Sequence, residues 1–225
     1  MSKLKENKMA TSLSSKIKSH ATLKRLALRM LIPKNQYKPR LWVRLILNPF
    51  IHKKGRDSVI QRRTRMDLFP YHKFELGQGS IIEDFSTVNN GVGDVLIGKK
   101  TIIGMSCTLI GPVSIGDDVM LAQNIVVSAL NHEYKDVSIS PSMQKVICKP
   151  IVISDRVWIG ANCVITAGVT LGKHCIVGAG SVVTKDVPDY SVAVGNPAKV
   201  VKKYNSETLC WENVVKIKEI IDNDK

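Results

Sequence analysis

Histidine and cysteine are the side chains of this sequence with the widest chemical range, and it contains five of each. A neutral imidazole can take a proton from a hydroxyl group, a thiolate can attack an acyl group, and both side chains bind zinc. His132 stands out by its position. It follows Asn131 at the point where the most regular pattern of the sequence stops. The chemistry of His132 therefore depends on the elements on either side of it.

The other candidates for chemistry are weaker. The cysteines are odd in number and lack the spacing of a metal site. Cys148 and Cys210 have no neighbouring base in the sequence, so neither is expected to be a nucleophile. A zinc site built from three histidines would need more than His132 and His174, the two in the regular region. His174 occupies a variable position and is expected in a surface turn. No metal is expected.

A six-residue repeat surrounds His132. Its twelve key positions are all Ile, Leu or Val: Ile97, Ile103, Leu109, Ile115, Leu121 and Val127, then Ile153, Ile159, Ile165, Leu171, Val177 and Val183. The residue after each is mostly Gly, Ala or Ser. This period is typical of a hexapeptide β-helix, in which three short strands and their turns make a coil of eighteen residues. Residues 97–132 and 153–188 therefore predict two coils each, with a less regular one near residues 82–87.

A second inward position follows each aliphatic residue by four. It holds Cys107, Cys163 and Cys175. In so confined a position a thiol is expected to fill space, so we interpret these three cysteines as packing residues.

The repeat is interrupted by residues 133–152, a segment long enough to be functional or disordered. Its Tyr, Val, Ile and Met side chains predict that it packs, for example against a neighbouring subunit. His132 lies at its root, where the inward position becomes polar at Asn131. From the pattern alone, a hydrogen-bonded corner is the favoured reading of His132, and a catalytic base is the alternative.

Four motifs resemble one enzyme family. They are NHEYKD (131–136), VWIGANCVITAGVTLG (157–172), VGAGSVVTKDVP (177–188) and GNPAKVVK (195–202). The stretch from about residue 91 to residue 203 resembles the hexapeptide-repeat O-acetyltransferases of the galactoside and maltose branch, above all the capsule and exopolysaccharide enzymes. The resemblance implies a mainly β fold, a left-handed parallel β-helix with an ejected loop. It also implies a homotrimer that binds acetyl-CoA between subunits, and His132 as the catalytic base.

The resemblance also implies a binding track for coenzyme A. The residues that match it are Trp158, Gly160, Ala161, Ala179, Thr184, Lys185, Lys199 and Lys202. Trp158 would lie beside the cofactor, and the two C-terminal lysines would meet its phosphates. Some relatives hold the acceptor with an Asn one coil before the histidine, where this chain has Gly104. Asn89 and Asn90 are the candidates to replace it.

The expected reaction is direct transfer of an acetyl group from acetyl-CoA to a sugar hydroxyl. The acceptor would be a polysaccharide, its lipid-linked precursor or a small glycoside. His132 would take the hydroxyl proton and return it to the departing CoA sulfur. Glu133 and Asp136 are near in sequence, but neither is assigned to orient His132. The alternatives are an N-acetyltransferase of an amino-sugar nucleotide, a drug acetyltransferase and a non-catalytic β-helix used for assembly.

Positive charge is concentrated in the first third of the chain. Residues 1–75 contain 19 Lys and Arg and 4 Asp and Glu, a net charge of +15, whereas the remaining 150 residues contain 14 and 15. An anionic membrane surface, an acidic glycan or a merely solvated arm would fit this charge. Nucleic acid is disfavoured, because zinc-finger spacing and aromatic RNA-binding motifs are missing from the sequence.

The flanking segments complete the predicted organisation. Residues 1–75 form a basic helical arm, with helices expected over 16–31 and 41–51 that cap the β-helix, or bind anionic membrane through residues 1–56. The β-helix domain covers 76–203. A short C-terminal helix over 204–225 begins at Ser206. The first residues lack the apolar core of a signal peptide, so we expect a cytoplasmic enzyme, or one at the inner face of the membrane.

Overall fold

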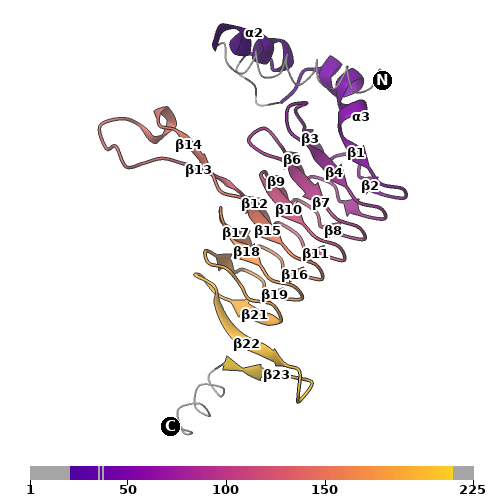
Figure 1. The fold of residues 1–225 in the computed structure, drawn as a ribbon, viewed down its shortest axis with the longest axis vertical. Helices are drawn as coiled ribbons and strands as arrows, with labels where there is room; N and C mark the ends of the chain where they lie inside the picture. The colour runs from indigo at the N-terminus through magenta and orange to yellow at the C-terminus, as the bar shows by residue number, and fades with distance from the viewer. Residues whose placement is uncertain (1–20, 35, 37, 215–225) are drawn as a thin grey trace, which may run out of the picture.

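The chain forms a parallel β-helix with a hairpin on its side and helices at its N-terminal end (Figure 1). The structure is a computed structural model and describes residues 21–34, 36 and 38–214. Three sheets wrap around one hydrophobic core, and each coil contributes one strand to each sheet. We call the three sheets faces A, B and C, in the order in which the chain visits them.

The strands of the three faces are short and mostly parallel. Face A contains β1 (Lys53–Lys54), β4 (Phe74–Leu76), β7 (Val95–Ile97), β10 (Val113–Ile115), β15 (Ile151–Ile153) and β18 (Thr170–Leu171). Face B contains β2 (Val59–Ile60), β5 (Ile81–Ile82), β8 (Ile102–Ile103), β11 (Met120–Leu121), β16 (Trp158–Ile159), β19 (Ile176–Val177), β21 (Ser191–Val194), β22 (Lys199–Asn205) and β23 (Cys210–Asn213). Face C contains β3 (Arg65–Asp67), β6 (Thr87–Asn89), β9 (Thr108–Ile110), β12 (Val126–Ser128), β17 (Val164–Ile165) and β20 (Val182–Val183).

The repeat predicted the core correctly. All twelve aliphatic positions are buried, none more than 3 % exposed. They stack because the register keeps them aligned from coil to coil, as in the row Ile103, Leu121 and Ile159 on face B. Cys107, Cys163 and Cys175 are also buried, which confirms their reading as packing thiols.

The β-helix begins earlier than expected. Its first coil starts with β1 at Lys53, so the boundary that we expected at residue 76 is wrong. Leu76, Ile82 and Val88 do keep the six-residue spacing and are buried. This confirms the less regular coil predicted near residues 82–87. Extra residues before and after it, in 68–73 and 90–94, shift the phase of the repeat. Both insertions lie where the chain passes from face C to face A, an edge that we call the C–A corner.

The second N-terminal helical segment covers the first coil. It comprises η1 (Val43–Leu47) and α3 (Asn48–Ile51), and Val43 is completely buried. The Asn48 side-chain amide donates to the carbonyl of Leu68, 2.9 Å away. These contacts support the predicted role as a cap.

The first helical segment is more exposed. Helix α2 (Ala21–Leu31) ends just before Pro33, as expected, and leaves Leu23, Leu26 and Met30 exposed. Residues 16–20 of the predicted helix lie outside the described residues. Within the described part of the chain, no helix combines the length and the apolar character needed to span a membrane.

The predicted C-terminal helix is wrong over residues 206–213. Strand β22 pairs antiparallel with β21, a turn follows, and β23 pairs antiparallel with β22. Trp211 lies opposite Tyr204 with ring centroids 5.5 Å apart, so its apolar surface belongs to a cross-strand pair and not to a helical stripe. Residues 215–225 of the predicted helix lie outside the described residues.

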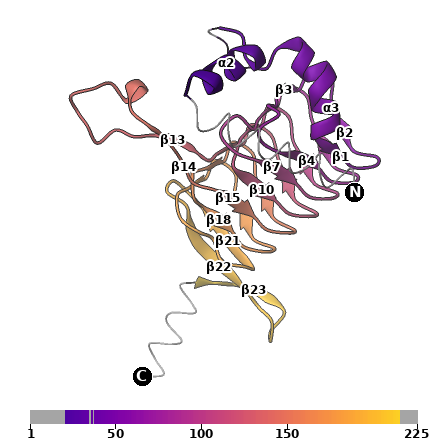
Figure 2. The same cartoon turned by 45° about the horizontal axis from the view of Figure 1, so that its top comes forward.

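The ejected segment is a β-hairpin that projects from the C–A corner (Figures 1 and 2). Strand β13 (Leu130–His132) pairs with β14 (Val146–Cys148), and the short 3₁₀ helix η2 (Pro141–Met143) lies between them. The chain rejoins the coils at Ile151, which pairs with Val113 on face A. The interruption therefore ends before Ile151, earlier than the expected boundary at residue 152.

Candidate active site

His132 is the last residue of β13, at the base of the hairpin, and it is exposed. Its strand partner is Val146. Asn131, expected at an inward position, is also exposed, because its pairing with Ile147 lifts the strand off the coil. The expected hydrogen-bonded corner is therefore wrong. Among the described residues, none makes a hydrogen bond to the His132 imidazole.

The two acids that follow His132 have other partners. Glu133 accepts a hydrogen bond from the backbone of Tyr134 at 3.2 Å. Asp136 accepts from the hydroxyl and the backbone of Ser138 at 2.6 and 2.9 Å, and these bonds lower the pKa of the Asp136 carboxyl. In this arrangement neither acid orients His132.

Trp158 lies on the opposite side of the β-helix. It is on the outer surface of face B, in register with Met120 and Ile176, and is 47 % exposed. In a three-sided prism, face B is opposite the C–A corner from which the hairpin with His132 leaves. A single chain therefore separates Trp158 from the base of the hairpin by the hydrophobic core.

Gly160, Ala161 and Ala179 lie together at the corner between faces B and C. A Cβ atom added to Gly160 would lie 2.6 Å from the backbone nitrogen of Ala179, so the coils pack too closely there for a side chain. The Gly180 amide donates to the Ala161 carbonyl at 2.8 Å. These small residues therefore have a structural role whether or not a cofactor lies beside them.

Lys199 and Lys202 extend the surface that carries Trp158. Both are exposed on β22, and Lys202 follows Ile176 and Val192 in the cross-strand row that runs through Trp158. Lys199 lies opposite Val194 at the end of the same strand pair. The structure thus gathers these two lysines and Trp158 on one face.

Thr184 and Lys185 belong to a different region. Both are exposed at the C–A corner of the last coil, on the same edge as the hairpin. The neighbouring Asp186 accepts a hydrogen bond from the Thr170 backbone at 2.7 Å and fixes this turn. The expected coenzyme A residues therefore form two groups, one on face B and its adjoining corner, and one beside the hairpin edge.

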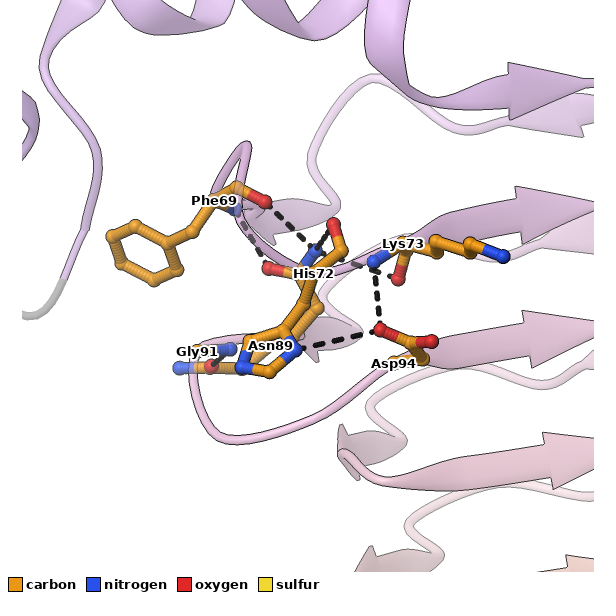
Figure 3. A network of polar contacts seen from close by, with 7 residues as sticks. Phe69, His72, Lys73, Asn89, Gly91 and Asp94 are labelled. Atoms are coloured by element: carbon orange, nitrogen blue, oxygen red, sulfur yellow. Dashed lines mark hydrogen bonds and ion pairs between the residues drawn. The ribbon is translucent and has the colours of Figure 1, made fainter. Parts of the chain in front are cut away.

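Asn90 has a structural role and not the acceptor contact that we expected. Its side chain is completely buried. The amide oxygen accepts from the Phe69 backbone at 2.6 Å, and the amide nitrogen donates to the carbonyls of Phe69 and His72 at 3.1 and 2.9 Å (Figure 3). It holds the loop of residues 68–73. Asn89 lies nearer the surface and accepts from the Gly91 backbone at 2.7 Å.

The sequence did not single out His72 and Asp94, which meet at this corner (Figure 3). The His72 Nδ1 atom lies 3.4 Å from an Asp94 carboxylate oxygen, which also accepts from the Lys73 backbone at 2.8 Å. The Tyr71 ring lies 5.2 Å from the His72 ring. The His72 and Asp94 side chains are partly exposed. They fall in the insertions between regular coils, where the repeat gives no signal.

Family models match both regular parts of the chain. The model described as the bacterial transferase hexapeptide (six repeats) matches residues 150–185. The model described as the hexapeptide repeat of succinyl-transferase matches residues 94–129. Together they cover the coils on both sides of the hairpin.

Curated relatives are named as O-acetyltransferases. A galactoside O-acetyltransferase of Lactococcus lactis is 32% identical over 160 residues, which is 69% of this chain and 75% of that protein. A putative lipopolysaccharide biosynthesis O-acetyl transferase of Escherichia coli is 37% identical over 107 residues, 44% of this chain and 55% of that protein. The chain spans about half the length of that protein, and 46% of a probable acetyltransferase of Mycobacterium tuberculosis.

A solved structure shares the fold. A variant of an N-acyltransferase from Bacillus cereus, in complex with dTDP-4-amino-4,6-dideoxyglucose and coenzyme A, superimposes with a TM-score of 0.61 at 20% identity. The match covers 81% of this chain and 96% of that chain.

Proposed function

Because the chain belongs to the hexapeptide-repeat acetyltransferase family, we propose that it moves an acetyl group from acetyl-CoA to a sugar hydroxyl. The observation that carries this proposal is the position of His132, an exposed imidazole at the base of the one hairpin that interrupts the described coils. The names of the galactoside and lipopolysaccharide relatives support oxygen as the acceptor atom.

His132 is the general base of the proposed reaction. A sugar hydroxyl is a poor nucleophile near neutral pH, and an imidazole that takes its proton during attack accelerates such a step by about 10²–10⁴-fold. The oxygen forms a bond to the thioester carbonyl carbon, and the carbon–sulfur bond then breaks. The imidazolium returns the proton to the departing CoA sulfur, so the histidine is restored.

The proposed site is shared between copies of the chain in a homotrimer. One chain holds His132 and Trp158 on opposite sides of its core, so a site that uses both needs a second copy. Exposed apolar side chains support such contacts. On face B they form the row Val59, Ile102, Met120 and Trp158, and on the hairpin they include Tyr134, Val137 and Met143. In a trimer, face B of one copy with Lys199 and Lys202 would bind acetyl-CoA beside the hairpin base of the next.

The C–A corner is the proposed place for the acceptor. Asn89 and Asp94 lie on the same edge as the base of the hairpin, two coils away, and His72 lies three coils away, which corresponds to about 10 and 15 Å at the spacing of paired strands. Carboxylate, imidazole and amide groups beside an aromatic ring suit the hydroxyl groups of a sugar. An acceptor that reaches both places is longer than a monosaccharide, which favours a polysaccharide or its lipid-linked precursor.

The basic N-terminal arm brings the enzyme to the inner face of the membrane in this proposal. Residues 1–56 contain 15 Lys and Arg and one Glu, and α2 exposes Leu23, Leu26 and Met30. Anionic lipids attract such segments, and an apolar helix stripe can enter the interface. Cytoplasmic acetyl-CoA would then meet a membrane-borne acceptor.

The proposed function is tested by the variant His132→Asn, which keeps hydrogen-bonding capacity but cannot carry the proton. We expect kcat to fall by about 10²-fold or more, with folding, oligomeric state and coenzyme A affinity unchanged. His174→Asn is the matched control, because His174 is also exposed but lies at a different corner. Turnover near the wild-type rate in a folded His132→Asn enzyme would remove His132 from the mechanism.

Product chemistry separates the remaining alternatives. An acetyl ester is cleaved by mild base, whereas the amide made by an N-acetyltransferase survives it. A panel of glycans, glycosides and amino-sugar nucleotides assayed with acetyl-CoA therefore decides between oxygen and nitrogen as the acceptor. Calorimetry without any coenzyme A binding to the folded protein would favour an assembly role.

A further inference from the structure

A basic hollow lies between the N-terminal segment and the first coil. Its volume is about 590 Å³, within the range of small-molecule sites. Five of its lining residues are cations: Lys38, Arg44, Arg62, Arg63 and Arg65. The first two come from the segment around η1, and the others from the chain that leads into β3 and from β3 itself.

The charge of this hollow is largely uncompensated. The acid on its wall, Asp67, is buried and already bound to Arg65, with 2.7 Å between the charged atoms. Asp84 accepts a hydrogen bond from the backbone of Arg63, whose guanidinium lies over the Phe85 ring at 5.5 Å. Across the described ranges, no carboxylate oxygen lies within 4.0 Å of the charged atoms of the remaining lining cations.

The chemistry of the lining points to phosphate. Arginine presents a planar fork of donors that binds two phosphate oxygens at once, and charge-assisted hydrogen bonds of this kind are stronger than neutral ones. Arg44 and Arg62 are exposed and line the hollow from two separate segments of the chain. An anion would also relieve the repulsion among the like charges.

An apolar ridge adjoins the hollow on the same helical segment. Leu45 is 66 % exposed, Ile46 58 % and Phe50 88 %, and Leu41 lies one turn before Leu45. The stretch from residue 38 to residue 66 contains nine Lys and Arg but one Asp. Apolar side chains bordered by cations match the boundary between the headgroups and the acyl chains of an anionic bilayer.

We propose that this hollow binds the phosphate group of an anionic lipid, while the ridge of Leu41, Leu45, Ile46 and Phe50 enters the apolar layer. This deepens the membrane association proposed above by giving it a site in the described chain, and it does not depend on acetyl transfer. Figures 1 and 2 show α2 and α3 at the N-terminal end of the β-helix, with the hairpin projecting from its side further along the coils.

The experiment compares the double variant Arg44→Gln/Arg62→Gln with Lys99→Gln/Lys173→Gln in the full chain. Both lose two exposed positive charges, but Lys99 and Lys173 lie at the corner between faces A and B. Binding is measured by co-sedimentation with phosphatidylcholine vesicles, with and without phosphatidylglycerol. We expect the wild type to bind the anionic vesicles, the first variant to bind about tenfold more weakly, and the second within about twofold of the wild type.

Competition with pyrophosphate distinguishes a specific phosphate site from non-specific electrostatic attraction to the vesicle surface. Pyrophosphate should release the wild type from anionic vesicles at concentrations where sodium chloride of equal ionic strength does not. The proposal is overturned if the two double variants lose binding equally, or if pyrophosphate acts no better than chloride. A raised KM for acetyl-CoA in Arg44→Gln/Arg62→Gln, assayed on a soluble glycoside, would assign the hollow to the donor site and also overturn it. Leu45→Gln/Phe50→Gln should weaken vesicle binding without changing pyrophosphate binding.

Discussion

The coils and the hairpin use the same kinds of side chain in opposite ways. In the coils, every aliphatic side chain of the repeat is buried against its own chain. On the hairpin, Val137 is 98 % exposed, Met143 78 % and Tyr134 76 %. The interior of the coils is thus complete within one chain, whereas the hairpin, like the outer surface of face B, carries apolar side chains that its own chain does not cover.

This difference assigns stability to the interior of the coils and the proposed catalysis to the hairpin. A row of buried aliphatic residues stabilises the β-helix coil by coil. His132 belongs to the hairpin, at the point where the six-residue repeat is interrupted. We therefore expect substitutions in the buried rows of the coils to unfold the protein, and substitutions on the hairpin to change assembly and catalysis while the fold persists.

The largest expected effect comes from placing a charge in the core. Ile165→Asp buries a carboxylate among aliphatic side chains and should lower the free energy of unfolding by about 4 kcal/mol or more, enough to prevent folding. Val137→Asp makes the same kind of change on the hairpin and should leave the stability of the single chain within about 0.5 kcal/mol. Urea denaturation compares the two. Equal losses would show that the hairpin is part of the folding core.

A smaller loss is expected at the C–A corner. Asn90→Ala leaves the Phe69 amide and the His72 carbonyl without their partner, and each buried unsatisfied group costs about 1–3 kcal/mol. Asn89→Ala removes one bond to Gly91 nearer the surface and should cost about 0.5–1.5 kcal/mol. Thermal unfolding of both variants checks the order. A reversed order would mean that Asn89 and not Asn90 holds this corner.

Replacing the two lysines on face B should weaken the binding of acetyl-CoA without changing the chemical step. Lys199→Ala/Lys202→Ala removes two exposed cations near the end of the row that runs through Trp158. We expect KM for acetyl-CoA to rise about tenfold with kcat unchanged, the behaviour of a lost ground-state contact. Lys99→Ala/Lys173→Ala, at the corner between faces A and B, is the control. If kcat fell while KM stayed constant, these lysines would act in the chemical step.

The smallest expected effect is on the reactivity of the buried cysteine thiols in the coils. Burial raises the pKa of Cys107 to about 11 and that of Cys175 to about 12, from an ordinary value of 9.0. A raised folded pKa means that the stabilisation is fully present below pH 9.0 and is lost as the pH rises toward 11–12. At pH 8, Cys210, which is exposed, should react with iodoacetamide well before either buried thiol. Mass spectrometry of the labelled peptides checks this order.

The sequence predicted the regular coils because inward aliphatic residues recur every six positions. It indicated the coil of Leu76, Ile82 and Val88 only as a less regular one near residues 82–87, because Ile97 follows Val88 by nine positions and Leu76 follows Met66 by ten. Those insertions are corner loops fixed by contacts between coils, such as those of Asn90, and such contacts leave no period in a single sequence.

The structure of the C-terminal segment and the arrangement of the site residues were harder to predict, because both depend on contacts between coils. The apolar residues around Trp211 fit a helix as well as a strand, and pairing with the edge of face B decided the outcome. The motifs indicated which residues resemble a coenzyme A track, but not that they divide between face B and the C–A corner. That division follows from winding the chain around three faces.

The most direct test of the central claim, a site shared between copies, is complementation between two inactive variants. His132→Asn lacks the base, and Trp158→Ala lacks the expected donor contact, so each alone should be nearly inactive at low acetyl-CoA. When they are co-expressed in equal amounts, random assembly of a cyclic trimer should restore about one quarter of the sites, each with His132 from one copy and Trp158 from its neighbour. Activity that never exceeds the sum of the separate variants, in assemblies shown to be mixed, would contradict the shared site.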